Sequence, residues 1–205
     1  MTDIVVTAHN HVLGNPEAFY AKLRRMTGSL DTVQVQTIQG LFDATPHWPV
    51  GWLAYGLATA WHECRLKPQR EWGSRAYLDK YDTGSLAKAL GNTPEDDDDG
   101  ILYAGRGLVQ LTGARNYRNA GAYLGLDLLG KPDLALAPDN AARILVWGMQ
   151  TGAFTGKKLA DYMVDRGTHD AFVRCRRIIN GSDKSEQIAG YADVVQDALT
   201  AGEYK

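Results

Sequence analysis

WLAYGLATAWHE, residues 52–63, predicts a buried helix that ends in a carboxylate. Apolar side chains recur at the spacing of one helical face, namely Leu53, Leu57, Ala60 and Trp61. Glu63 then lies in the last turn, where the negative end of the helix dipole and neighbouring aromatic side chains disfavour a charged carboxylate. We expect a raised pKa at Glu63, which suits a general acid. A solvated glutamate at a helix end is the alternative, and this segment alone does not decide between them.

Glu71 is a second carboxylate, eight residues after Glu63. Between them, Pro68 predicts that the helix ends and the chain folds back, so the two carboxylates can face each other across a groove. Inverting hydrolysis of a glycosidic bond uses such a pair, about 6.5–9.5 Å apart, with the attacking water between them. For Glu71 alone, an ion pair with a neighbouring lysine or arginine is the simpler interpretation.

Glycines and neutral polar side chains alternate through YAGRGLVQLTGARNY, residues 103–117. Residues 105–107 predict a turn between two short strands, and a helix over 114–124 follows, capped by Thr112 or Gly113. Three neutral side chains can hydrogen-bond an N-acetyl sugar or orient a water: Gln110, Thr112 and Asn116. A glycine hairpin whose polar side chains bond to its own backbone is the alternative.

Together these segments resemble the family 19 glycoside hydrolases, and more closely their compact phage endolysin branch than plant chitinases with extra loops. The resemblance covers about residues 17–200 and rests on His62-Glu63, Glu71, Tyr103–Thr112, Asn116-Tyr117, Asp127–Leu129 with Pro132–Leu134, and Ile179–Gly181. It implies a mainly α, lysozyme-like fold with two helical lobes, a small β-hairpin and a central substrate groove.

The resemblance also implies roles for single residues. Glu63 matches the general acid, Glu71 the base that activates water, and Thr112 a residue that positions this water. The candidate substrate-binding residues are His62, Trp72, Tyr103, Arg106, Gln110, Asn116, Tyr117 and Asn180. Trp72 is included because it adjoins Glu71, whereas we expect the other four tryptophans to lie in the core.

Three features depart from the family pattern. The second glutamate usually follows the first by nine residues, so Asp97–Asp99 in the acidic run remain alternatives for the base. Cys64-Arg65-Leu66 stands where Gly-Gly often follows the His-Glu pair by one residue. An arginine that many chitinases place near the C-terminus, to organise the carboxylates, has no clear counterpart, since 187–205 contains none.

Composition favours one catalytic domain over residues 1–205, without a separate wall-binding domain. The chain has 205 residues, of which 44% are hydrophobic, and a net charge of −2, which argues against nucleic-acid binding. The start, MTDIVVTAHNHVLG, has no positively charged beginning and only a short apolar run, so we expect neither a signal peptide nor a membrane span. We expect a monomer, made in the host cytoplasm without membrane insertion, that reaches the periplasm and cell wall through a holin pore if a phage encodes it.

Neither a metal nor another cofactor is expected. The five histidines, His9, His11, His47, His62 and His169, form no metal signature, and the acidic run EDDDD (95–99) lacks calcium-loop spacing. Cys64 and Cys175 are expected to be free, packed thiols.

Capping signals and periodicity predict several other helices, which begin at Asn15-Pro16, Asp31, Ser85, Pro138 and Thr155 or cover 169–179 and 185–201. The leading function is an endolysin that cleaves the β-1,4 bonds of peptidoglycan between N-acetylmuramic acid and N-acetylglucosamine with inversion. The same chemistry on chitin and a non-catalytic wall-binding role are the alternatives.

Overall fold

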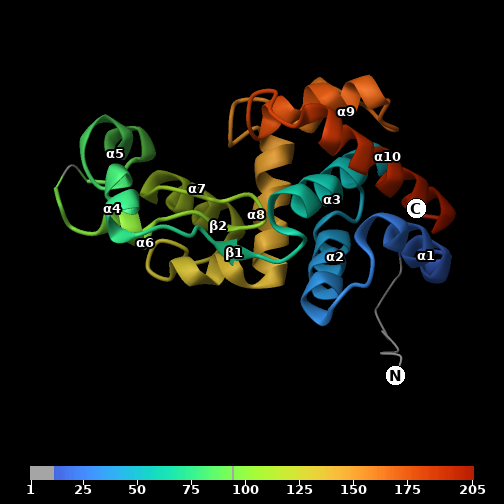
Figure 1. The fold of residues 1–205 in the computed structure, drawn as a ribbon, viewed down its shortest axis with the longest axis horizontal. Coiled ribbons are helices and arrows are strands. Elements are labelled where there is room, and N and C mark those ends of the chain that lie inside the picture. Colours follow the sequence, from blue (N-terminus) through green and yellow to red (C-terminus); the bar gives the residue numbers. More distant parts are fainter. Residues whose placement is uncertain (1–11, 94) are drawn as a thin grey trace.

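The computed structural model describes residues 12–93 and 95–205, and it confirms the mainly helical prediction (Figure 1). The helices are α1 (Pro16–Thr27), α2 (Thr32–Ala44), α3 (Val50–Cys64), α4 (Arg75–Leu78), α5 (Gly84–Leu90), α6 (Asp99–Leu102), α7 (Ala114–Leu124), α8 (Pro138–Thr151), α9 (His169–Cys175) and α10 (Ser185–Ala201). Turns of 3-10 helix cover Asp79–Tyr81, Pro132–Leu136, Leu159–Asp161 and Arg176–Ile178. The strands β1 (Gln69–Arg70) and β2 (Arg106–Gly107) form one small sheet.

Local capping explains why most helices begin and end where the sequence predicts. Asn15 Oδ1 accepts the Ala18 amide at 3.0 Å, and Pro16 occupies the first turn of α1. Asp31 and Gln34 form a reciprocal capping box at the start of α2. Gly125 adopts a left-handed conformation directly after α7, which the absence of a side chain allows.

Helix α3 lies near the middle of the molecule and is almost entirely buried (Figure 1). It packs along α10, while α2 packs against α8 and α1 against the other side of α10. The short helices α4, α5 and α6 lie at the end of the molecule opposite α1 and the C-terminus (Figure 1). The long helix α8 stands between these two regions, and its Ile144 and Trp147 enter a second apolar cluster with Tyr117 of α7.

The predicted local hairpin at residues 105–107 is wrong. Strand β2 pairs antiparallel with β1 from far upstream, with Gln69 opposite Gly107 and Arg70 opposite Arg106. Arg106 also forms a single bridge with Leu111, so the chain turns between these two residues instead. Turn-forming glycines mark where a chain can bend, but they do not identify which strand will pair.

The exit from α3 explains how the chain folds back toward β2. Arg65 and Leu66 both adopt left-handed conformations, with φ of 55° and 60°. Their amides bond to Trp61 O and Ala60 O, which closes the helix before Pro68 is reached. These two positions are those at which the family that the sequence resembles often has Gly-Gly, and glycine adopts this conformation at the lowest cost.

Both cysteines are free and buried, as expected, and burial raises the pKa of each thiol to about 12. His9 and His11 lie outside the described residues. Within the described ranges, no helix has the length and apolar character that a bilayer crossing requires.

An exposed charge cluster links α9 to α10. His169 Nδ1 lies 2.6 Å from Asp193 Oδ2, and its Nε2 lies 3.1 Å from Glu186 Oε2. Hydrogen bonding to Asp193 and Glu186 raises the pKa of His169 above its ordinary value.

We therefore expect the cluster to stabilise the protein in acid and to lose this effect as pH rises. A raised folded-state pKa contributes stability that is fully present below the unfolded value of about 6.5, and that disappears above the folded value. Replacing His169 with glutamine should lower the melting temperature at about pH 5.5 and have little effect at about pH 9. His47→Gln, at an exposed histidine without this cluster, is the control. An equal effect of His169→Gln at both pH values would contradict the assignment.

Candidate functional site

Glu63 lies in the last turn of α3 and is partly exposed, but a cation holds it. Its Oε1 accepts a hydrogen bond from Arg176 Nη1 at 2.5 Å. The Arg176 side chain is only 4% exposed. From the sequence we expect only the helix dipole and aromatic side chains around Glu63, so this buried guanidinium is a neighbour that the sequence did not indicate.

Arg176 is the cation that contacts Glu63. It lies in the 3-10 turn after α9, before the stretch 187–205 in which no arginine occurs. Its Nε donates to Asp183 O at 3.0 Å, so the guanidinium joins the end of α3 to the loop before α10. Arg176 precedes Asn180 by four residues, and this proximity to the Ile179–Gly181 motif is the signal that could have identified it.

Glu71 lies directly after β1 in a partly buried position, and its two carboxylate oxygens each accept one hydrogen bond. Tyr81 Oη donates to Oε1 at 3.0 Å, and the Gly105 amide donates to Oε2 at 3.2 Å. Burial raises the pKa of Tyr81, which keeps its hydroxyl protonated and able to donate. Glu71 forms no ion pair with any residue that the structure describes, so the ion-pair interpretation is wrong. No sequence pattern pointed to Tyr81.

Three predicted site residues converge on Gly105. A side-chain carbon built there would lie 2.7 Å from Gln110 Oε1, 3.1 Å from Glu71 Oε2 and 3.1 Å from Thr112 Oγ1. The Thr112 hydroxyl donates to Gln110 O at 2.8 Å, which fixes its position within this group. A carboxylate, a hydroxyl and an amide at one point can together hold and activate a water.

We expect Gly105→Ala to impair this group more than the fold. Gly105 has no positive φ, so alanine suits its backbone, and the atoms in the way are ends of flexible side chains. The new methyl group would displace Gln110 Oε1 and shift Glu71 Oε2 and Thr112 Oγ1 slightly, which we expect to cost about tenfold in kcat/KM. Gly190→Ala, where a new methyl group meets nothing within 4 Å, is the matched control. Wild-type activity in Gly105→Ala would mean that these three side chains do not act together.

Two predicted substrate-binding residues are almost completely buried. Tyr117 is fully buried, and Arg106 is 3% exposed. Arg106 bonds to Asp133 at 2.7 Å, to backbone oxygens and to the Tyr117 hydroxyl, so this pair supports the loop from within. Tyr103 packs on Tyr117 and is half-buried, with its hydroxyl directed to Leu129 O at 3.3 Å. These three are supporting residues for the chain that carries Gly105.

The other predicted residues are at least partly accessible. Trp72 is 89% exposed beside Glu71, whereas Trp48, Trp61 and Trp147 are buried. Asn116 Nδ2 donates to Thr112 O at 2.7 Å, which ties α7 to the Thr112 segment, and Asn180 is exposed. Burial lowers the pKa of His62 despite the opposite effect of Glu63, so the imidazole is neutral at pH 7.

The acidic run is occupied by contacts within its own region. Asp97 Oδ2 accepts the Thr93 hydroxyl at 2.7 Å, and Asp99 Oδ2 accepts the Thr93 amide at 3.1 Å. Asp98 pairs with Arg75. These contacts favour a structural role for the run and leave Glu71 as the better candidate for the base.

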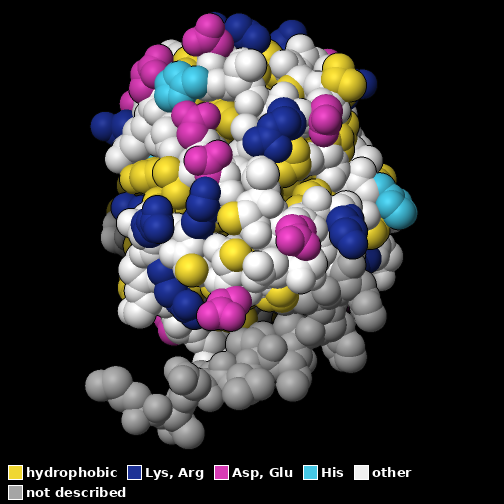
Figure 2. Space-filling model, turned by 90° about the vertical axis from the view of Figure 1, so that its right-hand side faces the viewer, with side chains coloured by type: hydrophobic (Ala, Val, Ile, Leu, Met, Phe, Trp, Pro, Cys, Tyr) yellow, Lys and Arg dark blue, Asp and Glu magenta, His cyan; other side chains and the backbone are white. Residues whose placement is uncertain are grey.

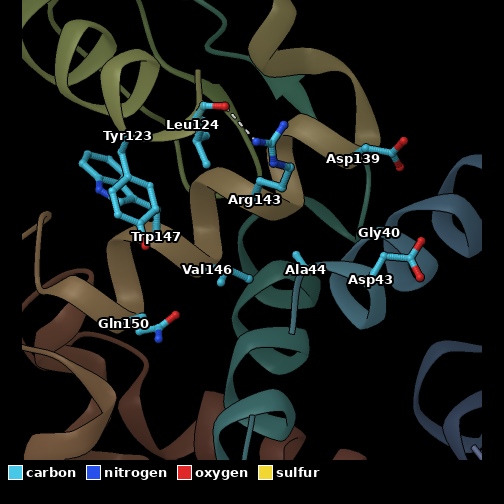
Figure 3. A pocket seen from close by; sticks show the side chains of 10 residues that line it. All are labelled: Gly40, Asp43, Ala44, Tyr123, Leu124, Asp139, Arg143, Val146, Trp147 and Gln150. Atoms are coloured by element: carbon cyan, nitrogen blue, oxygen red, sulfur yellow. Dashed lines mark hydrogen bonds between the residues drawn. The ribbon is translucent and has the colours of Figure 1, made fainter. Parts of the chain in front are cut away.

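Two surface pockets have neither glutamate among their lining residues. One of about 340 Å³ lies between α2, α7 and α8, where Tyr123 and Trp147 face Asp43, Asp139 and Gln150 (Figure 3). Another of about 610 Å³ is lined by Arg70, Arg106, Asp133 and part of the acidic run. Among the described residues, no group of three or more His, Cys, Asp or Glu side chains could hold a metal ion.

Solved structures of chitinases share this arrangement of helices. Chitinase C from Streptomyces griseus HUT6037 has a TM-score of 0.62 at 19% identity, covering 90% of this chain and 77% of that chain. The chain has the family 19 chitinase fold. A bacterial family 19 chitinase gives a TM-score of 0.57 at 21% identity, with 90% of this chain and 94% of that chain covered.

Sequence similarity to a named protein is confined to a short segment. Chitinase 8 of Oryza sativa subsp. japonica is 39% identical over 70 residues, which is 34% of this chain. That segment spans 27% of the rice protein's length. No protein-family model matches the chain. The predicted lysozyme-like, chitinase-related glycoside hydrolase fold is confirmed.

Proposed function

We propose that the protein is an endolysin-type hydrolase of peptidoglycan. It cleaves the β-1,4 bond between N-acetylmuramic acid and N-acetylglucosamine with inversion at the anomeric carbon. Glu63 protonates the leaving oxygen, and Glu71 deprotonates the attacking water. The proposal includes action as a monomer at the cell wall, which the enzyme reaches through a holin pore.

The convergence of Glu71, Gln110 and Thr112 at Gly105 is the observation that carries this proposal. Because these three side-chain atoms lie close together, a water bound beside Glu71 can give its proton to the carboxylate while the hydroxyl and the amide orient it. Both hydrogen bonds to the Glu71 carboxylate come from neutral donors, the Tyr81 hydroxyl and the Gly105 amide.

Arg176 is the feature that most opposes the acid role of Glu63. Its hydrogen bond engages Oε1, and no described residue hydrogen-bonds to Oε2. In the proposed mechanism Oε2 carries the proton to the leaving oxygen while Arg176 holds Oε1 in place. After transfer, the guanidinium stabilises the new carboxylate, so the pair assists the step in which negative charge develops.

Chitin hydrolysis is the second candidate, because the structural neighbours and the rice relative are chitinases. Both polymers present β-1,4-linked N-acetyl sugars, so the same carboxylates would serve. The two differ in the peptide branches that peptidoglycan carries on alternate sugars.

Mass spectrometry of digested polymers tests the proposal. Purified peptidoglycan should yield fragments with reducing-end N-acetylmuramic acid, whereas reducing-end N-acetylglucosamine would indicate a glucosaminidase. Free peptides with intact glycan would exclude glycosidase action. Cleavage of chitin oligosaccharides together with intact peptidoglycan would favour the second candidate.

A further inference from the structure

A pocket between α1 and α10 is lined by charged and apolar side chains that have no part in the proposed action of the two glutamates. It measures about 500 Å³ and is lined by Lys22, Arg25, Met26, Glu186, Gln187, Gly190, Tyr191, Val194 and Asp197. Figure 2 shows this end of the molecule, where Lys and Arg side chains alternate with Asp and Glu among apolar ones. The surface here therefore suits a ligand with groups of both charges and some apolar area.

The pocket adjoins the end of α3 that carries Glu63. Tyr191, one of its lining residues, has its ring centroid 6.4 Å from that of His62, the residue before Glu63. Gln187 Nε2 donates to the Tyr191 hydroxyl at 3.1 Å, which fixes the position of this ring. A branch of a polymer bound at Glu63 can therefore extend past His62 and Tyr191 into the space between α1 and α10.

The two cations of the pocket are available to a ligand. Lys22 and Arg25 form no ion pair with any residue in the described ranges. They lie on the same side of α1 as Met26, at helical spacing. Gly190 forms an open part of the opposite wall, since a side-chain carbon built there would meet nothing within 4 Å. Val194 is 36% exposed and adds apolar surface.

We propose that this pocket binds the peptide branch of peptidoglycan, with Lys22 and Arg25 contacting its carboxylates. The inference rests on the proposed hydrolysis of peptidoglycan and names the part of the substrate that distinguishes it from chitin. Acidic groups at Glu186 and Asp197 suit the free ammonium group of such a peptide. The apolar side chains of Met26, Tyr191 and Val194 suit its alanine residues.

The test compares two substrates that differ only in the branch. Peptidoglycan is used intact or after an amidase has removed its peptides, and kcat/KM is measured on both. Lys22→Glu with Arg25→Glu should reduce activity on the intact polymer about tenfold or more and leave activity on the bare glycan unchanged. Arg24→Glu is the matched control, because Arg24 is a neighbouring cation in the same turn of α1 and does not line the pocket.

A second pair of variants blocks the space without changing charge. Gly190→Trp should reproduce the selective loss on intact peptidoglycan, while Gly190→Ala should behave as wild type. Equal losses on both substrates, or no loss on either, would overturn the pocket assignment and leave the hydrolase proposal standing. If the wild-type protein cleaves neither polymer, the proposed function itself is wrong, and this inference fails with it.

Discussion

Replacing Glu63 with glutamine is expected to lower kcat/KM on peptidoglycan by about a thousandfold. The amide has nearly the same shape as the acid but cannot supply a proton to the leaving oxygen. The substitution also replaces the carboxyl group that contacts Arg176, whose side chain is 4% exposed. The amide oxygen can still accept the hydrogen bond, so we expect a loss of about 2 kcal/mol in the free energy of unfolding, less than a broken buried pair usually costs.

The experiment must therefore distinguish a loss of catalytic activity from a loss of folded protein. Arg176→Gln breaks the same ion pair but retains the carboxyl, so it should be similarly destabilised and lose less activity than Glu63→Gln at a temperature where both are folded. Glu17→Gln, at an exposed position in α1, controls for the loss of one negative charge. Retention of more than about a tenth of wild-type kcat/KM by folded Glu63→Gln would remove this residue from the acid role.

The parts of the fold that could be predicted are those governed by short-range chemistry. Helix α7 has the predicted bounds because Gly113 and Gly125 mark both of its ends. Helix α3 was predictable because its apolar face repeats at helical spacing and is buried. In each case the residues that determine the element lie within or next to it.

Contacts between residues far apart in the sequence could not be predicted in this way. The pairing of β1 with β2 joins Gln69 to Gly107, and no turn signal lies between them that would select this partner. Arg176 and Glu63 are 113 residues apart, so their contact depends on how α9, α10 and α3 pack. The type of a residue also does not show whether its side chain points to the surface or into the protein. The sequence therefore allowed Arg106 to be assigned to substrate binding, although its side chain is buried.

Replacing Glu71 with glutamine is expected to lower kcat/KM by about a hundredfold or more, with almost no change in melting temperature. The amide can still accept from Tyr81 or from the Gly105 amide, and no buried cation loses its partner. What disappears is the ability to remove a proton from the water at Gly105. Loss of activity with an intact fold therefore reports the base itself.

Asp97→Asn and Asp99→Asn are the matched controls, because they remove carboxylates of the nearby acidic run, one exposed and one partly buried. Their carboxylates accept hydrogen bonds from Thr93, which an amide oxygen can also accept, so both variants should remain active. If Glu71→Gln is fully active and either aspartate variant is inactive, the base lies in the acidic run. The side chains of Glu71, Gln110 and Thr112 near Gly105 would then orient the substrate instead of the water. Glu63 and that aspartate would be the acid and the base.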